Sequence, residues 1–333
     1  MTLSTTSQAR LASERTKSLE AHDLYLQGRF VASTHTERGL RASLPLFQRA
    51  AEIDPTYPLP WVGMADAYAW LADDYLPARE AYAKAKDALR RAIDIAPSLA
   101  EAHVVLGWIR YAHDWDFTGA EHELRQAIAF DSSSAWGHSN YAFVLVALRR
   151  PGEALVEMKR ALALDPLSAS LSANLEWLYL MERQYEQVIA QHAVTQQLDP
   201  TYFFGDSWVA AAYREKGRYR ESIDAYTRAQ AFLGDRPLPG LAVTYARSGD
   251  SARARRELQR LLAYAKQHHV KPETIAQVYA NLGEREHAFE WLNQGIESRS
   301  NEMVWLQQNP AYDPLRTDAR FAAIARRVHV PSS

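Results

Sequence analysis

Apolar residues recur along most of the chain at the spacing of an amphipathic helix. Between residues 135 and 166, Tyr141 and Leu145 fall on one face of a first helix. Ala154, Met158 and Ala161 do the same on a second helix. The alanines leave room for the two helix axes to approach closely, while the larger side chains fill the remaining space. This stretch therefore predicts a pair of packed antiparallel helices.

The same pattern returns with a nearly constant period. Pro166 and Pro200 each close a Leu-Asp-Pro sequence and are 34 residues apart. Counting back another 34 residues reaches Ser132, and a further 35 reaches Pro97. Proline disfavours helical geometry in the residue before it, so Pro97, Pro166 and Pro200 each mark the end of a second helix, and Ser132 takes the same place in its repeat. A period of this size predicts a stack of helical hairpins, in which each hairpin covers an apolar face of the next.

The residues at fixed positions within each repeat resemble those of the tetratricopeptide repeat (TPR) family. The resemblance covers nearly the whole chain, and it implies an all-α, right-handed TPR solenoid of about eight helical hairpins with a C-terminal capping segment. Two of the best-matched repeats supply Trp61, Met64, Ala65, Tyr68, Ala85, Leu89, Ala92 and Pro97, and then Val209, Ala210, Tyr213, Gly217, Tyr219, Tyr226 and Ala229.

Three short sequences narrow the resemblance to one bacterial subfamily. They are Asp23-Leu24-Tyr25-Leu26-Gln27-Gly28-Arg29 near the start, His113-Asp114-Trp115-Asp116-Phe117 near the middle and Asp313-Pro314-Leu315-Arg316-Thr317-Asp318-Ala319-Arg320-Phe321 near the end. In that subfamily the array is the C-terminal module of winged-helix regulators, Ser/Thr kinases and nucleotide cyclases. The sequence has no phosphate-binding loop, kinase signature or recognisable winged helix. The resemblance therefore implies a non-enzymatic scaffold for protein–protein interaction. The alternative is that the chain is the sensory or regulatory half of a signalling protein.

The repeat pattern predicts three regions. Residues 1–18 are rich in polar side chains and are expected to be a disordered or fraying lead. Residues 19–300 hold the repeats, and residues 301–333 form a cap and tail. The apolar residues of this last region are expected to cover the final hairpin: Trp305, Tyr312, Leu315, Phe321 and Ile324.

Composition limits the possible partners and compartments. A formal net charge of −2 argues against broad electrostatic binding to nucleic acid or to a membrane. No signal peptide or long apolar stretch is present, and the absence of cysteine fits a reducing, cytoplasmic compartment.

Candidate chemistry is sparse, and the sequence predicts no catalytic residue, metal site or cofactor. His103 and His138 occupy packing positions of their repeats, and the nearby histidines lack metal-binding spacing. Glu176 stands where a small residue is expected, which indicates either a kink between hairpins or an acid turned into the groove. An enzyme built on a helical-repeat frame remains an alternative, and it would need a buried polar cluster.

The strongest candidate site is a row of large side chains on the first helices of adjacent repeats. The family's groove-lining positions hold aromatic and other apolar residues here, which predicts an exposed patch for a protein or peptide partner. The competing interpretation is that these rings pack between helices. If the row binds a partner, Trp108, Phe143 and Trp177 should be partly exposed. The predicted partner-binding residues are Trp70, Trp108, Tyr111, Trp136, Asn140, Phe143, Asn174, Trp177 and Met181.

Overall fold

The computed structural model describes residues 16–328, apart from the side chains of Asp73, Asp74 and Phe203. The chain divides between Asn140 and Tyr141 into two compact units, called here the N-terminal and the C-terminal unit. Residues 1–15 of the predicted lead and 329–333 of the predicted tail lie outside the described residues.

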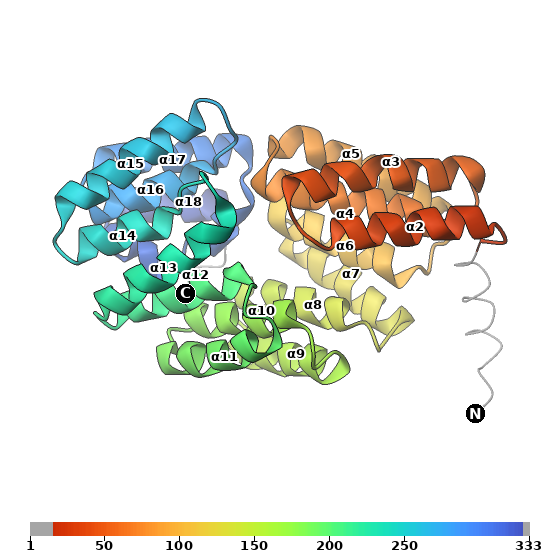
Figure 1. The fold of residues 1–333 in the computed structure, drawn as a ribbon, viewed down its shortest axis with the longest axis horizontal. Helices are drawn as coiled ribbons and strands as arrows, with labels where there is room; N and C mark the ends of the chain where they lie inside the picture. Colours follow the sequence, from red (N-terminus) through yellow and green to blue (C-terminus); the bar gives the residue numbers. More distant parts are fainter. Residues whose placement is uncertain (1–15, 329–333) are drawn as a thin grey trace. The chain divides into compact units, whose positions relative to one another are not determined.

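Within the described residues the helices pair into eight hairpins and no strand occurs, which confirms the all-α solenoid class (Figure 1). The N-terminal unit contains α2 (Leu19–Ala32), α3 (Glu37–Ile53), α4 (Leu59–Asp74), α5 (Ala78–Ile95), α6 (Ala100–Ile109), η1 (Arg110–Asp114), α7 (Phe117–Phe130) and the start of α8 (Ala135–Ala147). The C-terminal unit continues with α9 (Pro151–Leu164), α10 (Ala169–Met181), α11 (Tyr185–Leu198), α12 (Phe203–Glu215), α13 (Tyr219–Leu233), α14 (Pro239–Arg247), α15 (Ser251–Ala265), α16 (Pro272–Asn281) and α17 (Arg285–Ser298). It ends with η2 (Asn301–Trp305), η3 (Pro310–Leu315) and α18 (Ala319–Arg327).

Small residues let neighbouring helices pack closely. Gly28 of α2 and Gly63 of α4 both lie against the buried ring of Phe47 in α3. A Cβ atom would be 2.5 Å from that ring at Gly28 and 2.7 Å from it at Gly63. The small positions of the repeat are therefore fixed by the close approach of helices, as the sequence pattern indicates.

Two insertions in the repeat pattern lie within helices rather than in long loops. Between Tyr68 and Ala85 the sequence has eight residues more than the repeat pattern, which predicts a protruding loop; this prediction is wrong, because the extra residues lengthen α4 and α5. The extra residue near His113 widens the end of α6 into the π-helical turn η1, and Trp115 then takes a left-handed conformation with φ of 59°.

The chain after α17 has two roles. Helix α18 packs on α17, where the guanidinium of Arg320 lies 4.1 Å from the ring centroid of Phe289. The two short 3₁₀ helices η2 and η3 precede α18 and pack elsewhere. Trp305 of η2 packs on Trp177 of α10, and η3 packs on α16. No helix among the described residues is both long and apolar enough to cross a membrane.

Candidate functional site

Residues 301–316 of the C-terminal unit lie on the first helices of its hairpins. We call these residues the C-terminal segment, and we call the surface beneath them the receiving face. The segment is irregular, with η2 and η3 joined by four residues, and it includes the buried side chains of Met303, Leu306 and Tyr312. Side chains of the receiving face that contact it include Phe143, Arg149, Trp177, Arg183, Arg247, Lys271, Gln277 and Asn281. The backbone oxygen of Glu273 also contacts it.

One end of the segment is held by aromatic packing. Phe143 and Trp177 occupy the same position in consecutive repeats, and their ring centroids are 4.4 Å apart. Trp305 of the segment lies 5.1 Å from Trp177 and 6.5 Å from Phe143. Three rings at such distances bury a large apolar area and favour one another's orientation. They close the receiving face over Trp177, which is only 1% exposed.

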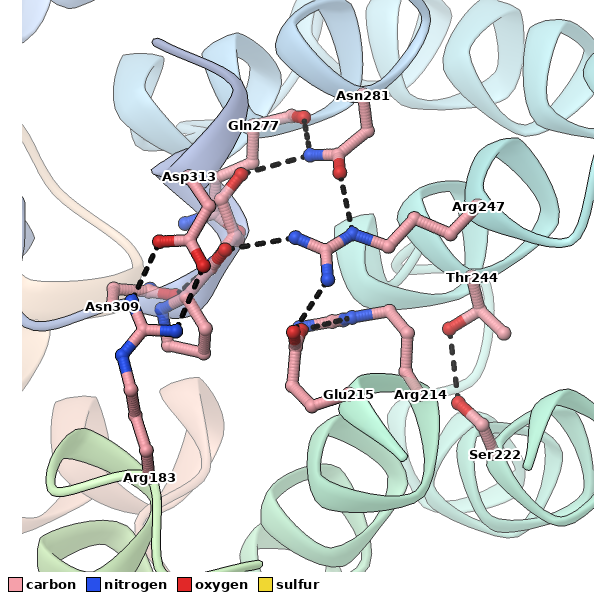
Figure 2. Close-up of polar contacts among 12 residues, drawn as sticks. Arg183, Arg214, Glu215, Ser222, Thr244, Arg247, Gln277, Asn281, Asn309 and Asp313 are labelled. Carbon is pink, nitrogen blue, oxygen red and sulfur yellow. Dashed lines mark hydrogen bonds and ion pairs between the residues drawn. The ribbon is translucent and has the colours of Figure 1, made fainter. Parts of the chain in front are cut away.

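The middle of the segment is held through its main chain (Figure 2). Arg247 donates a hydrogen bond from Nη2 to the carbonyl oxygen of Pro310 at 2.8 Å. Asn281, one repeat later, donates from Nδ2 to the carbonyl oxygen of Ala311, also at 2.8 Å. Pro310 and Ala311 begin the 3₁₀ helix η3, and bonds to their carbonyl oxygens do not depend on their side chains, so this part of the face can hold such a turn with little regard to its sequence.

Neighbouring polar groups fix the direction of Arg247. Its Nε donates to Asn281 Oδ1 at 2.7 Å, and its Nη1 pairs with the carboxylate of Glu215. Glu215 in turn accepts a bond from the buried Arg214 at 3.0 Å. The guanidinium therefore meets the segment in a defined orientation, which lowers the entropic cost of its contact with Pro310.

Two arginines of the receiving face occupy turn positions that glycine occupies in other hairpins. Gly217, Gly249 and Gly283 close the later hairpins with positive φ, which suits a residue without a Cβ atom. Arg149 and Arg183 adopt the same geometry, with φ of 61° and 58°. A non-glycine residue in this region costs about 1 kcal/mol or more.

Both strained arginines reach the C-terminal segment. Arg149 donates to Gln307 Oε1 at 2.7 Å. Arg183 makes two bonds to the carboxylate of Asp313, at 2.6 and 2.8 Å (Figure 2). Although burial disfavours the charged form of Asp313, the bonds from Arg183 and Arg316 lower its pKa. This paired, two-bond geometry is the most specific contact between segment and face.

A buried carboxyl group marks the place where the segment begins. Glu273 of α16 is fully buried, and its Oε1 accepts a hydrogen bond from the Ser300 hydroxyl at 2.7 Å. The Tyr312 hydroxyl donates to the backbone oxygen of Glu273 at 3.0 Å. Burial and the nearby carboxylate of Glu302 raise the pKa of Glu273 to about 7, while Ser300 and Lys271 oppose this shift.

The seam between segment and face contains polar atoms without partners. Trp177 Nε1, Gln308 Oε1 and Glu273 Oε2 are buried, and none has a hydrogen-bond partner within the described structure. A buried polar group left in this state costs about 1–3 kcal/mol. The C-terminal segment therefore fills the receiving face without satisfying all of its hydrogen bonds.

A second polar cluster lies between α10, α11 and α12. The carboxylate of Glu176 accepts a bond from the Thr195 hydroxyl and lies 3.3 Å from His192 Nδ1. On its other side, His192 Nε2 is 3.6 Å from Asp206 Oδ1, which also pairs with Arg228 at 2.8 Å. The idea that Glu176 turns into the groove is thus wrong, because the side chain is buried among helices and held by Thr195 and His192.

The corresponding face of the N-terminal unit is charged and aromatic. Arg29 of α2 donates to the Tyr25 hydroxyl at 2.9 Å, and it attracts Asp66 of α4. Asp66 remains accessible to solvent, yet desolvation by the surrounding protein raises its pKa to about 6 against the effect of Arg29. Trp70 of α4 and Trp108 of α6 are half-buried.

The nine predicted partner-binding residues separate into two groups. Five retain accessible surface: Trp136 is 39% exposed, and Trp70, Trp108, Asn140 and Asn174 are half-buried. Four are buried, so the expected exposure of Phe143 and Trp177 is wrong: the buried residues are Tyr111, Phe143, Trp177 and Met181.

The physical reason for this burial differs between the units. Tyr111 packs against Trp108 at 5.5 Å and against Phe117 at 5.9 Å within the N-terminal unit. In the C-terminal unit, Trp305 covers Phe143 and Trp177. The sequence interpretation missed the bonding residues Arg183, Arg247 and Asn281. For Arg149 and Arg183 the sequence did contain a signal: both are arginines at turn positions where later repeats have glycine.

Comparison with known proteins supports the repeat assignment. The family profile described as tetratricopeptide repeat matches residues 274–302, which cover α16 and α17. Comparison with curated protein sequences finds no match. The resemblance to repeat modules of bacterial regulators stays a prediction.

Solved structures share the fold at low sequence identity. An IFIT1 monomeric mutant with Gppp-AAAA superposes with a TM-score of 0.63 and 16% identity, over 93% of this chain and 71% of that chain. The human IFIT1 dimer with m7Gppp-AAAA gives 0.55 and 14%, over 97% and 89%. A tetratricopeptide repeat protein from Parabacteroides merdae gives 0.52 and 13%, over 81% and 98%. With its eight described hairpins the protein has the fold of a helical solenoid, and one of these hairpins matches the tetratricopeptide repeat profile.

Proposed function

We propose that the protein is a non-catalytic scaffold that binds an extended or helical segment of a partner protein on the first helices of its N-terminal unit. The observation that carries this proposal is the C-terminal segment itself. In the C-terminal unit, the first helices already hold a polypeptide by aromatic packing and by side-chain bonds to its carbonyl oxygens. The repeat is therefore able to bind peptide on this side.

Equivalent positions of the N-terminal unit offer similar chemistry. Trp108 precedes Phe143 by 35 residues and corresponds to the rings that hold Trp305. It is half-exposed, whereas Phe143 is buried. Trp70 lies 4.2 Å from the His35 ring, packs against the buried Leu40 and Leu71, and keeps part of its surface accessible. Large, stiff rings such as these supply binding area at little entropic cost.

The test is to capture partners from native lysate and to map their contact sites by cross-linking and mass spectrometry. We expect cross-links to cluster on α2, α4 and α6. A Trp70→Ala/Trp108→Ala variant should weaken binding by about thirtyfold or more, since one well-placed anchor contributes about 2 kcal/mol. A matched control is Phe232→Ala, which removes an exposed ring from α13.

Two outcomes would contradict the proposal. One is a partner that binds the Trp70→Ala/Trp108→Ala variant as tightly as it binds the Phe232→Ala control. The other is a set of cross-links confined to second helices such as α3 and α5.

A further inference from the structure

The C-terminal segment meets its receiving face in the manner of a bound peptide rather than of a repeat. It does not continue the hairpin pattern, and it follows a left-handed residue, Arg299, with φ of 51°. Its central contacts run from side chains to the carbonyl oxygens of Pro310 and Ala311. Its two side-chain anchors are Trp305 at one end and Asp313 eight residues later.

The receiving face is built for such a ligand at a cost to its own backbone. Arg149 and Arg183 take the conformation that three other hairpins give to glycine, and both side chains end on the segment. A cap that only shielded the last hairpin would need neither arginine, because both lie in early turns of the C-terminal unit.

The C-terminal segment leaves polar groups of the receiving face unpaired, which favours its replacement by another peptide. Trp177 Nε1 and Glu273 Oε2 belong to the face, and both are buried without a hydrogen-bond partner. A ligand that presented an acceptor to Trp177 would satisfy a group that the segment leaves unsatisfied. The present occupant is thus not the best one that the surface could hold.

We propose that the receiving face is a second peptide-binding site, closed in this state by residues 301–316. It fits a partner segment that adopts a similar series of 3₁₀ turns, with an aromatic residue followed about eight residues later by a carboxylate. The aromatic side chain would pack on Phe143 and Trp177, and the carboxylate would pair with Arg183. Arg247 and Asn281 would bind carbonyl oxygens between these anchors. This surface is distinct from the N-terminal face proposed above.

The protonation state of Glu273 should influence how often the C-terminal segment leaves the receiving face. The charged groups around it are Lys271 ahead of α16 and Glu302 in η2, which pair at 2.6 Å, and Tyr312 of η3 also faces it. Since the pKa of Glu273 is raised to about 7 in the closed state, the closed state is favoured at low pH. The extra stability of the closed state that comes from protonated Glu273 is lost as pH rises through 7. With an ordinary pKa near 4.3 in the open state, the opening equilibrium should increase about tenfold from pH 6 to pH 8.

Binding in trans tests the site directly. The probe is a labelled synthetic peptide with the sequence of residues 301–316, offered to the full-length protein. A Trp305→Ala/Asp313→Ala protein, whose own segment is weakened at both anchors, should bind the peptide at least tenfold more tightly than wild type. Adding Arg183→Gly, which gives that turn the glycine of the later hairpins, should remove the gain. A peptide with the same two alanines is the matched control.

Hydrogen exchange on the wild-type chain gives a second measurement that needs no weakened variant. Amides of the segment should open more often than those of α16, with an opening constant about tenfold larger at pH 8 than at pH 6. Glu273→Gln should abolish that pH dependence. The proposal is overturned if the segment is as protected as α16, or if a folded Trp305→Ala/Asp313→Ala protein binds the peptide no better than wild type.

Discussion

The contact of His192 with two carboxylates predicts a pH dependence of stability that one substitution should remove. His192 is 8% exposed and lies between Glu176 and Asp206. Burial alone would lower its pKa, but the contacts with Asp206 and Glu176 raise the pKa from 6.5 to about 9. The imidazolium form is therefore favoured in the folded protein. We predict that His192→Gln, which keeps a polar side chain without the charge, removes this contribution.

The magnitude follows from the two pKa values. Each pKa unit corresponds to about 1.4 kcal/mol, so the rise from 6.5 to about 9 gives up to about 3 kcal/mol. Because the folded pKa is the higher one, this stability is fully present below pH 6.5. It is lost as pH rises from 6.5 to about 9.

Urea unfolding at several pH values between 6 and 9.5, followed by circular dichroism, measures this loss. The wild type should lose stability across the window, whereas His192→Gln should have a much flatter profile. His287→Gln is the matched control, since this histidine lies 3.4 Å from Glu284 but its side chain is 56% exposed. Parallel pH profiles for wild type and His192→Gln would refute the reasoning.

Three further predictions follow from packing. Trp177→Ala should lower the free energy of unfolding by about 3–5 kcal/mol, measured by urea denaturation, because the ring is buried; a change below 1 kcal/mol would show that it is dispensable for packing. Gly240→Ala should cost about 1–3 kcal/mol, because a Cβ there would be 2.2 Å from the ring of Tyr226, and an unchanged thermal melt would contradict this. Deletion of residues 309–333 should lower solubility and melting temperature, and a truncated chain as stable and monomeric as the parent would show that the tail is merely appended.

The hairpins could be predicted from the sequence because their determinants are local and periodic. Each repeat places small residues such as Ala142 and Ala161 where two helices meet, and both are fully buried. Proline at the ends of second helices fixed the phase of the pattern. The eight described hairpins follow from these signals alone.

The candidate site could not be predicted in the same way. Whether Trp177 faces water or a neighbour depends on Trp305, which lies 128 residues away in sequence and outside the repeat. The repeat pattern gives no indication that Trp305 and Trp177 are in contact. The contacts of Arg247 and Asn281 are with backbone carbonyl oxygens, which leave no trace in residue identity.

The C-terminal segment also changes how this unit can fold. In most repeat solenoids each hairpin contacts only its neighbours, so folding can start anywhere and the ends can fray independently. Here Arg149 meets Gln307 across 158 residues, and Arg183 meets Asp313 across 130. Such contacts raise the contact order and slow the last stage of folding, because a long loop must close before they form. During synthesis, the C-terminal unit must therefore wait until residues 301–316 have been made before these contacts can form. Its early hairpins, with the rings of Phe143 and Trp177 uncovered, are the part for which a chaperone would matter most.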